Sequence, residues 1–134
     1  MAMKFSRGSK ILVLAFAMML VCGFLFTPAG LETRPLTSLR SYALIPFFLS
    51  TTILDVASLV LIFKRPRIAA ILGSVAAISY VFLAPGDQAH LFFLGEPVPL
   101  GISLNEFVVL VPSVVVLLFA RSVYNENKVR SPPT

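Results

Sequence analysis

Asp55 is the only acidic side chain near the middle of a long apolar stretch of the sequence, and it is the residue best placed to do chemistry. Two hydroxyl-bearing residues share its helical face, because Thr51 precedes it by four positions and Ser58 follows it by three. A carboxyl group near the centre of a membrane helix costs roughly 2.5–3.5 kcal/mol and usually faces other helices. The residue types therefore suggest three roles: proton or cation handling, a hydrogen-bonded anchor for helix packing, or contact with another subunit.

Residues on other segments lie at a similar depth to Asp55. Asp55 precedes Lys64 by nine residues, which is roughly 13 Å along a helix and near the middle of a bilayer. Equivalent counts place residues of the third and fourth apolar segments nearby. No lysine or arginine lies deep enough in the apolar segments to pair with Asp55, so we expect a neutral carboxyl group that hydrogen-bonds a serine, a threonine or a freed carbonyl. The predicted intramembrane polar site comprises Asp55, Thr51, Ser58, Ser74, Tyr80 and Ser113.

A second group of polar residues gives a weak metal-binding signal. Asp87 and His90 lie three positions apart, with Glu96 and Glu106 further along the chain. Histidine and carboxylates together are common metal ligands. The chain has one histidine and its acids follow no ligand spacing, so solvated loop charges are the simpler interpretation, and we expect neither a metal nor a cofactor.

The common catalytic motifs are missing from the sequence. There is no HExxH, no GxSxG, no phosphate-binding loop and no glycine-rich dinucleotide fingerprint. The single cysteine, Cys22, excludes an internal disulfide and a paired-thiol redox site. We therefore expect that the chain is not an enzyme, and no motif identifies a family.

Small residues recur on one face of the third apolar segment. Ala69, Gly73 and Ala77 follow one another at four-residue spacing. Small side chains at this spacing let helix backbones approach closely in lipid. The pattern predicts helix packing, either within one chain or between copies of it.

The elements that must position these residues are membrane helices. Hydrophobic residues make up 57% of the 134 residues and charged residues only 13%, against about 25% charged in soluble domains. Apolar runs near ~20 residues span a bilayer, where only helices satisfy their own backbone groups. We predict one domain over 1–134, an all-α integral membrane protein with a bundle of four transmembrane helices. The helices are expected at 11–27, 42–63, 68–84 and 103–124, with an outer loop at 85–102 and a polar tail at 125–134.

The first apolar segment has an alternative interpretation. Basic residues precede it and the sequence TPAG follows it, which loosely fits a cleaved signal peptide. Sixteen apolar residues, from Ile11 to Phe26, are long for that role. We favour a retained helix.

Prolines and hydroxyl residues mark the predicted helix ends. Pro66 suits the first turn of the third helix and makes the second and third helices an antiparallel hairpin. Thr37 or Ser38 is expected to cap the second helix. Pro46 and Pro112 lie inside helical patterns and are expected to kink them.

Basic residues are distributed unevenly between the two sides of the bundle. With both termini in the cytoplasm, nine of the eleven basic residues lie on that side and only Arg34 and Arg40 lie outside. This distribution follows the positive-inside rule, so the net charge of +5 indicates topology and not nucleic-acid binding. We expect a multi-pass protein of the plasma membrane with cytoplasmic termini.

The sequence favours a structural function over a catalytic one. The outer loop is unusually apolar for its length, with Phe92, Phe93, Leu94, Val98 and Leu100, so it should fold over the bundle or pack on another subunit. The first hypothesis is an accessory or structural subunit of a larger membrane complex, or a homo-oligomer, with the lipid bilayer as its other partner. The alternative is a small oligomeric transporter or channel that uses Asp55 to couple protons or cations.

Overall fold

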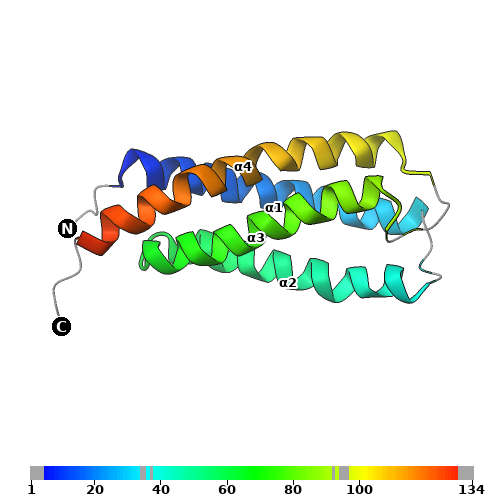
Figure 1. The fold of residues 1–134 in the computed structure, drawn as a ribbon, viewed down its shortest axis with the longest axis horizontal. Coiled ribbons are helices and arrows are strands. Elements are labelled where there is room, and N and C mark those ends of the chain that lie inside the picture. Colours follow the sequence, from blue (N-terminus) through cyan, green and yellow to red (C-terminus); the bar gives the residue numbers. More distant parts are fainter. Residues whose placement is uncertain (1–4, 34–35, 37, 92, 94–96, 130–134) are drawn as a thin grey trace.

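Four antiparallel helices form a bundle with both ends of the chain at one end of it (Figure 1). The computed structural model describes residues 5–33, 36, 38–91, 93 and 97–129, and the side chains of all of these except 24–33 and 129. The helices are α1 (Arg7–Thr33), α2 (Leu39–Leu61), α3 (Pro66–Gln88) and α4 (Leu100–Val129). Each helix packs on two neighbours, in the cyclic order α1, α2, α3, α4. The predicted all-helical fold with four helices is confirmed.

Three of the helices are long and apolar enough to cross a membrane. They are α2, α3 and the stretch of α4 from Leu100 to Lys128, by length and composition. The part of α1 whose side chains are described, Arg7 to Gly23, is shorter and is not among them. The chain therefore has the composition and architecture of a membrane protein.

The helices extend beyond the predicted boundaries at most ends. α3 continues through Pro85 to Gln88, and α4 begins at Leu100 and ends at Val129. Apolar periodicity marks only the stretch that suits lipid, whereas backbone hydrogen bonds continue into the polar residues beyond it. The prediction of a polar tail is therefore wrong for residues 125–129, which are helical, and residues 130–134 lie outside the described part of the chain.

The hairpin between α2 and α3 is as tight as the sequence predicts. The backbone N–H groups of Lys64 and Arg65 both donate to the carbonyl of Leu61, at 3.0 and 2.6 Å. Pro66 is the first residue of α3, where its missing N–H needs no partner. The turn therefore gives the last carbonyl of α2 its hydrogen-bond partners within four residues. It also makes α2 and α3 neighbours.

Ser38, one of the two residues predicted to cap α2, is its N-cap. Its hydroxyl accepts a hydrogen bond from the backbone N–H of Ser41 at 3.2 Å, and the Ser41 hydroxyl accepts one from the backbone N–H of Ser38 at 3.0 Å. This reciprocal pair is a capping box, which satisfies two N–H groups at once. The other candidate, Thr37, lies outside the described residues.

His90 ends α3 in a left-handed backbone conformation, with φ of 57°. The N–H of Leu91 bonds the carbonyl of Gly86, and the N–H of His90 bonds that of Asp87, both at 3.0 Å. This is the hydrogen-bond pattern of a Schellman motif, in which glycine is the commonest residue at the left-handed position. The exposed His90 therefore has a backbone role that its side-chain chemistry did not predict.

Replacing His90 by glycine is expected to stabilise the protein by up to about 1 kcal/mol, because glycine adopts the left-handed conformation without strain. Thermal unfolding in detergent, followed by circular dichroism, measures the change. The matched control is Ala89→Gly, at a neighbouring position with a negative φ of −82°. That control should destabilise the protein slightly, and an equal response of both variants would contradict the strain argument.

The interior of the bundle is largely apolar on α1, α3 and α4 and polar on α2. Phe16, Leu12 and Met19 of α1 are fully buried, and they pack with Val116 and Val123 of α4. Several large apolar side chains of α2 are exposed, whereas Phe48, Leu54 and Leu59 pack partly buried against the core. The four buried residues of α2 are all polar. They are Ser41, Thr51, Asp55 and Ser58. A helix with polar residues buried and apolar residues exposed is suited to a surrounding of lipid.

Candidate functional site

A cluster of polar side chains lies inside the bundle around Asp55. Asp55 has no exposed surface. Both of its carboxyl oxygens are buried without a hydrogen-bond partner among the described residues, and so are the hydroxyl groups of Thr52 and Tyr80. Polar groups in protein interiors are nearly always paired, and each exception needs an explanation. The cluster Thr52–Asp55–Tyr80 is therefore the candidate site.

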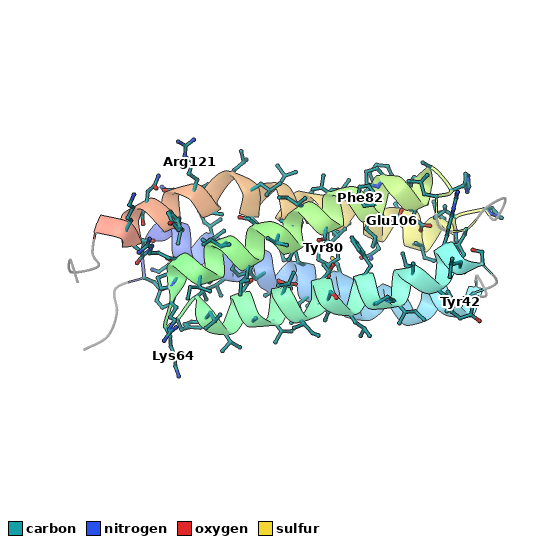
Figure 2. All side chains as sticks on the ribbon, turned by 60° about the horizontal axis from the view of Figure 1, so that its bottom comes forward. Tyr42, Lys64, Tyr80, Phe82, Glu106 and Arg121 are labelled. Carbon is teal, nitrogen blue, oxygen red and sulfur yellow. The ribbon has the colours of Figure 1, made fainter. Side chains whose placement is uncertain are left out.

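Three helices bring the cluster together. Asp55 and the Thr52 hydroxyl of α2 lie near the Tyr80 hydroxyl of α3, and so does Cys22 of α1. Tyr80 points from α3 into the middle of the bundle (Figure 2). The Thr52 and Tyr80 hydroxyls nevertheless lack the geometry of a hydrogen bond. The site thus joins residues 22, 52, 55 and 80 at one level of the bundle.

Gly23 of α1 leaves space for the hydroxyl of Tyr80. A β-carbon at this position would lie 2.9 Å from the phenol oxygen and 3.4 Å from the ring of Phe48. A larger residue at this position would require the Tyr80 hydroxyl to shift. A further polar contact lies at this level, because the side-chain amide of Asn105 on α4 donates to the carbonyl of Cys22 at 3.3 Å.

The other predicted polar residues bond to their own helices. Each donates its hydroxyl hydrogen to the carbonyl four residues earlier, at 2.6–2.9 Å. The donors are Thr51, Ser58, Ser74 and Ser113. The predicted hydrogen bond between Asp55 and a serine or threonine is therefore not formed. Back-bonding to the helix is a ready alternative for short hydroxyl side chains, and it requires no particular helix rotation.

Ser74 lies on a different face of α3 from Tyr80. Its side chain lines a groove between α3 and α4, whereas Tyr80 is buried in the bundle. Depth along a helix was predictable from residue counts, but the direction of each side chain was not. Thr52 was missed as a site residue, although its position three residues before Asp55 places it on a neighbouring part of the same face.

The polar residues at the other end of the bundle join α3 to α4. The side-chain amide of Gln88 donates to the hydroxyl of Ser103 at 3.0 Å and to a carboxylate oxygen of Glu106. Asp87 and Glu106 are buried and His90 is exposed. Within the described residues no three histidine, cysteine or acidic side chains form a metal-binding group, and Glu96 lies outside that part. The end of α3 is thus linked to the start of α4 by hydrogen bonds of Gln88 with Ser103 and Glu106.

The small residues of α3 pack inside the chain. Ala69, Gly73 and Ala77 are all buried. A β-carbon on Gly73 would overlap the ring of Phe16, which is fully buried. The small-residue face thus accommodates an aromatic ring of α1, and it is not available to a second copy of the chain.

The chain is thus an all-helical bundle with helices that are long and apolar enough to span a membrane, and it has a polar cluster in its interior. No protein-family model, curated protein or solved structure matches this chain. Function must therefore be argued from the site itself. Its carboxyl, phenol and hydroxyl groups can each donate or accept a hydrogen bond, so together they can hold a proton or a small polar guest.

Proposed function

We propose that this chain is a small multi-pass membrane protein that acts as an accessory subunit of a larger membrane assembly. All four helices cross the membrane in this proposal, with the termini in the cytoplasm of a plasma membrane. Lys64 and Arg121 lie at the end of the bundle that holds the termini, and Tyr42 and Glu106 lie at the other end (Figure 2). Together with the distribution of basic residues in the sequence, this separation supports the proposed orientation, because basic residues gather on the cytoplasmic side of membrane proteins.

The outward face of α4 carries the proposal. Large apolar side chains follow one another along it at alternating spacings of four and three residues, and each is 47–75% exposed. They are Leu100, Leu104, Phe107, Val111, Val114 and Leu118, here called the α4 seam. A repeat of this kind lets one helix pack along another through interlocking side chains. In a membrane, such packing supplies association energy that lipid tails do not.

Exposed apolar residues repeat at the same spacings on α2 and α3, so the α2 control described below tests whether the partner docks on the α4 seam. Two other candidate docking surfaces are occupied within the chain where the structure describes them. The small-residue face of α3 already holds Phe16, and Phe93 of the outer loop is buried in the chain. Phe92 and Leu94 lie outside the described residues. A partner helix laid along the seam would leave these internal contacts undisturbed.

Shortening two seam residues, Leu104→Ala with Phe107→Ala, is expected to release the partner subunit because the interlocking contacts are lost. The tagged chain is extracted in gentle detergent, and the co-purifying chains are identified by mass analysis. The control is Ile53→Ala with Val60→Ala, two exposed apolar residues of α2. The control should retain the partner. Recovery of the wild-type chain only as a monomer or homo-oligomer would refute the proposal.

The buried cluster supports a second candidate, a small oligomeric transporter or channel in which Asp55 couples protons or cations. The supporting observation is the set of buried atoms at Thr52, Asp55 and Tyr80 without partners. Intramembrane carboxyl groups often mark proton or ion pathways.

Asp55→Asn separates the two candidates, because the amide keeps the shape of the side chain and removes the titrating proton. In liposomes with a pH gradient, a transporter should lose pH-coupled flux in this variant and keep it in Ser58→Ala. An accessory subunit should still assemble with its partner when Asp55 is asparagine. Flux that survives the substitution would eliminate the transporter candidate.

A further inference from the structure

A groove between α3 and α4 opens on the outside of the bundle near the end that holds the termini. Its volume is about 550 Å³, and it is lined by Ala70, Ser74 and Ile78 of α3 and by Leu117, Arg121 and Tyr124 of α4, among others. The hydroxyl of Ser74 is already bonded to the carbonyl of Ala70 at 2.7 Å. The walls of the groove are therefore apolar in effect.

The groove has the length of one leaflet. Ala70 and Ile78 are eight residues apart, which is roughly 12 Å along a helix. Half of a hydrocarbon core of ~30 Å is about 15 Å. A single acyl chain that runs parallel to the helices would fit along this distance.

Positive charge gathers at the mouth of the groove. Arg121 lines it and is exposed, and the guanidinium of Arg67 lies over the Tyr124 ring at 4.9 Å, with Nη2 donating to the Tyr124 hydroxyl at 3.2 Å. Nε of Arg67 is buried without a hydrogen-bond partner among the described residues. Lys128 follows Tyr124 by four residues and shares its face of α4. Three cationic side chains thus lie near one end of the apolar groove.

No acidic side chain that the structure describes lines the groove. Glu126, the nearest of them in the sequence, accepts a hydrogen bond from the Ser122 hydroxyl at 3.1 Å. The residues of the mouth on α4 are 121, 124 and 128, which share one helical face. An anionic group placed there meets uncompensated positive charge.

We infer that this groove is a binding site for one acidic phospholipid, with an acyl chain between α3 and α4 and its phosphate at Arg67 and Arg121. Lipid tails resemble apolar side chains, so filling the groove does not by itself select a lipid. Selection comes from the headgroup, because basic pockets between membrane helices favour anionic lipids. The inference rests on the proposed membrane location and not on the accessory role.

The test measures lipid retained by the purified chain from mixed micelles of equal phosphatidylglycerol and phosphatidylcholine, by native mass spectrometry. The wild-type chain should retain phosphatidylglycerol preferentially. Arg121→Gln should lower that preference about fivefold, and Arg67→Gln with Arg121→Gln roughly twenty-five-fold, since each cation near the headgroup contributes about one such factor. Arg40→Gln, an exposed cation of the first turn of α2, should change nothing.

A second variant tests the groove separately from the charge. Ser74→Phe fills the channel without breaking a bond between helices, so it should lower the retention of both lipids. Added glycerol phosphate should not displace the bound lipid, because the acyl chain holds it in place. Equal retention of the two lipids by the wild-type chain would overturn the inference. So would an equal loss in Arg40→Gln, or unchanged retention in Ser74→Phe.

Discussion

Replacing Asp55 by leucine is expected to stabilise the purified chain against unfolding by about 1–3 kcal/mol. Asp55 is fully buried and its carboxyl oxygens have no partner in the described part of the structure. An unsatisfied buried polar group loses its bonds to water and gains none in return, a cost of about this size. Leucine has the same number of side-chain heavy atoms, branched at the same position, and removes that cost. Thermal or urea unfolding in detergent, followed by circular dichroism, measures the gain.

Neighbouring polar residues supply the controls for Asp55→Leu. Thr51→Val removes a hydroxyl that already bonds the carbonyl of Phe47 at 2.9 Å, so it should leave stability nearly unchanged. Tyr80→Phe removes another hydroxyl without a partner and should be neutral or stabilising. A loss of stability in Asp55→Leu would contradict the expectation. It would indicate that the carboxyl group binds water, an ion or a partner in the working protein.

Replacing Gly73 by leucine is expected to destabilise the bundle by about 3 kcal/mol. The added side chain would occupy the volume of the Phe16 ring, which is fully buried between α1 and α3. Overpacking a filled interior costs about 1–3 kcal/mol, and a ring without free space has little room to move. The same unfolding experiment measures the loss.

Gly101→Leu is the matched control for Gly73→Leu. Gly101 is also helical, but a β-carbon there meets nothing within 4 Å. Gly101→Leu should unfold at a temperature or urea concentration no lower than that of the wild-type chain. The double variant Gly73→Leu with Phe16→Ala should lose less than the sum of its single variants, because the two side chains compete for one space. Simple additivity would show that the two residues do not share it.

Local chemistry made several features predictable from the sequence. The three apolar stretches that become α2, α3 and α4 are visible because lipid-compatible runs need no tertiary information. The turn at Pro66 and the cap at Ser38 follow from the same kind of local rule. The ends of the helices were less predictable. His90 terminates α3 by a backbone conformation that its residue type does not favour.

The candidate site was predictable in part. Residue counting placed Asp55 and Tyr80 at one depth, and the structure brings them together with Thr52 and Cys22. Counting could not show that Ser74 faces the α3–α4 groove. Nor could it show that the serines and threonines bond to their own helices.

The sequence by itself determined the helices, their order and the depth of each polar residue, because these depend on composition along one chain direction. Only the tertiary structure decided which faces meet, since that depends on how each helix is rotated about its own axis. The rotation of α1 and α3 is set by the packing of Phe16 on Gly73. The tertiary structure also encloses the carboxyl of Asp55, which has no hydrogen-bond partner among the described residues.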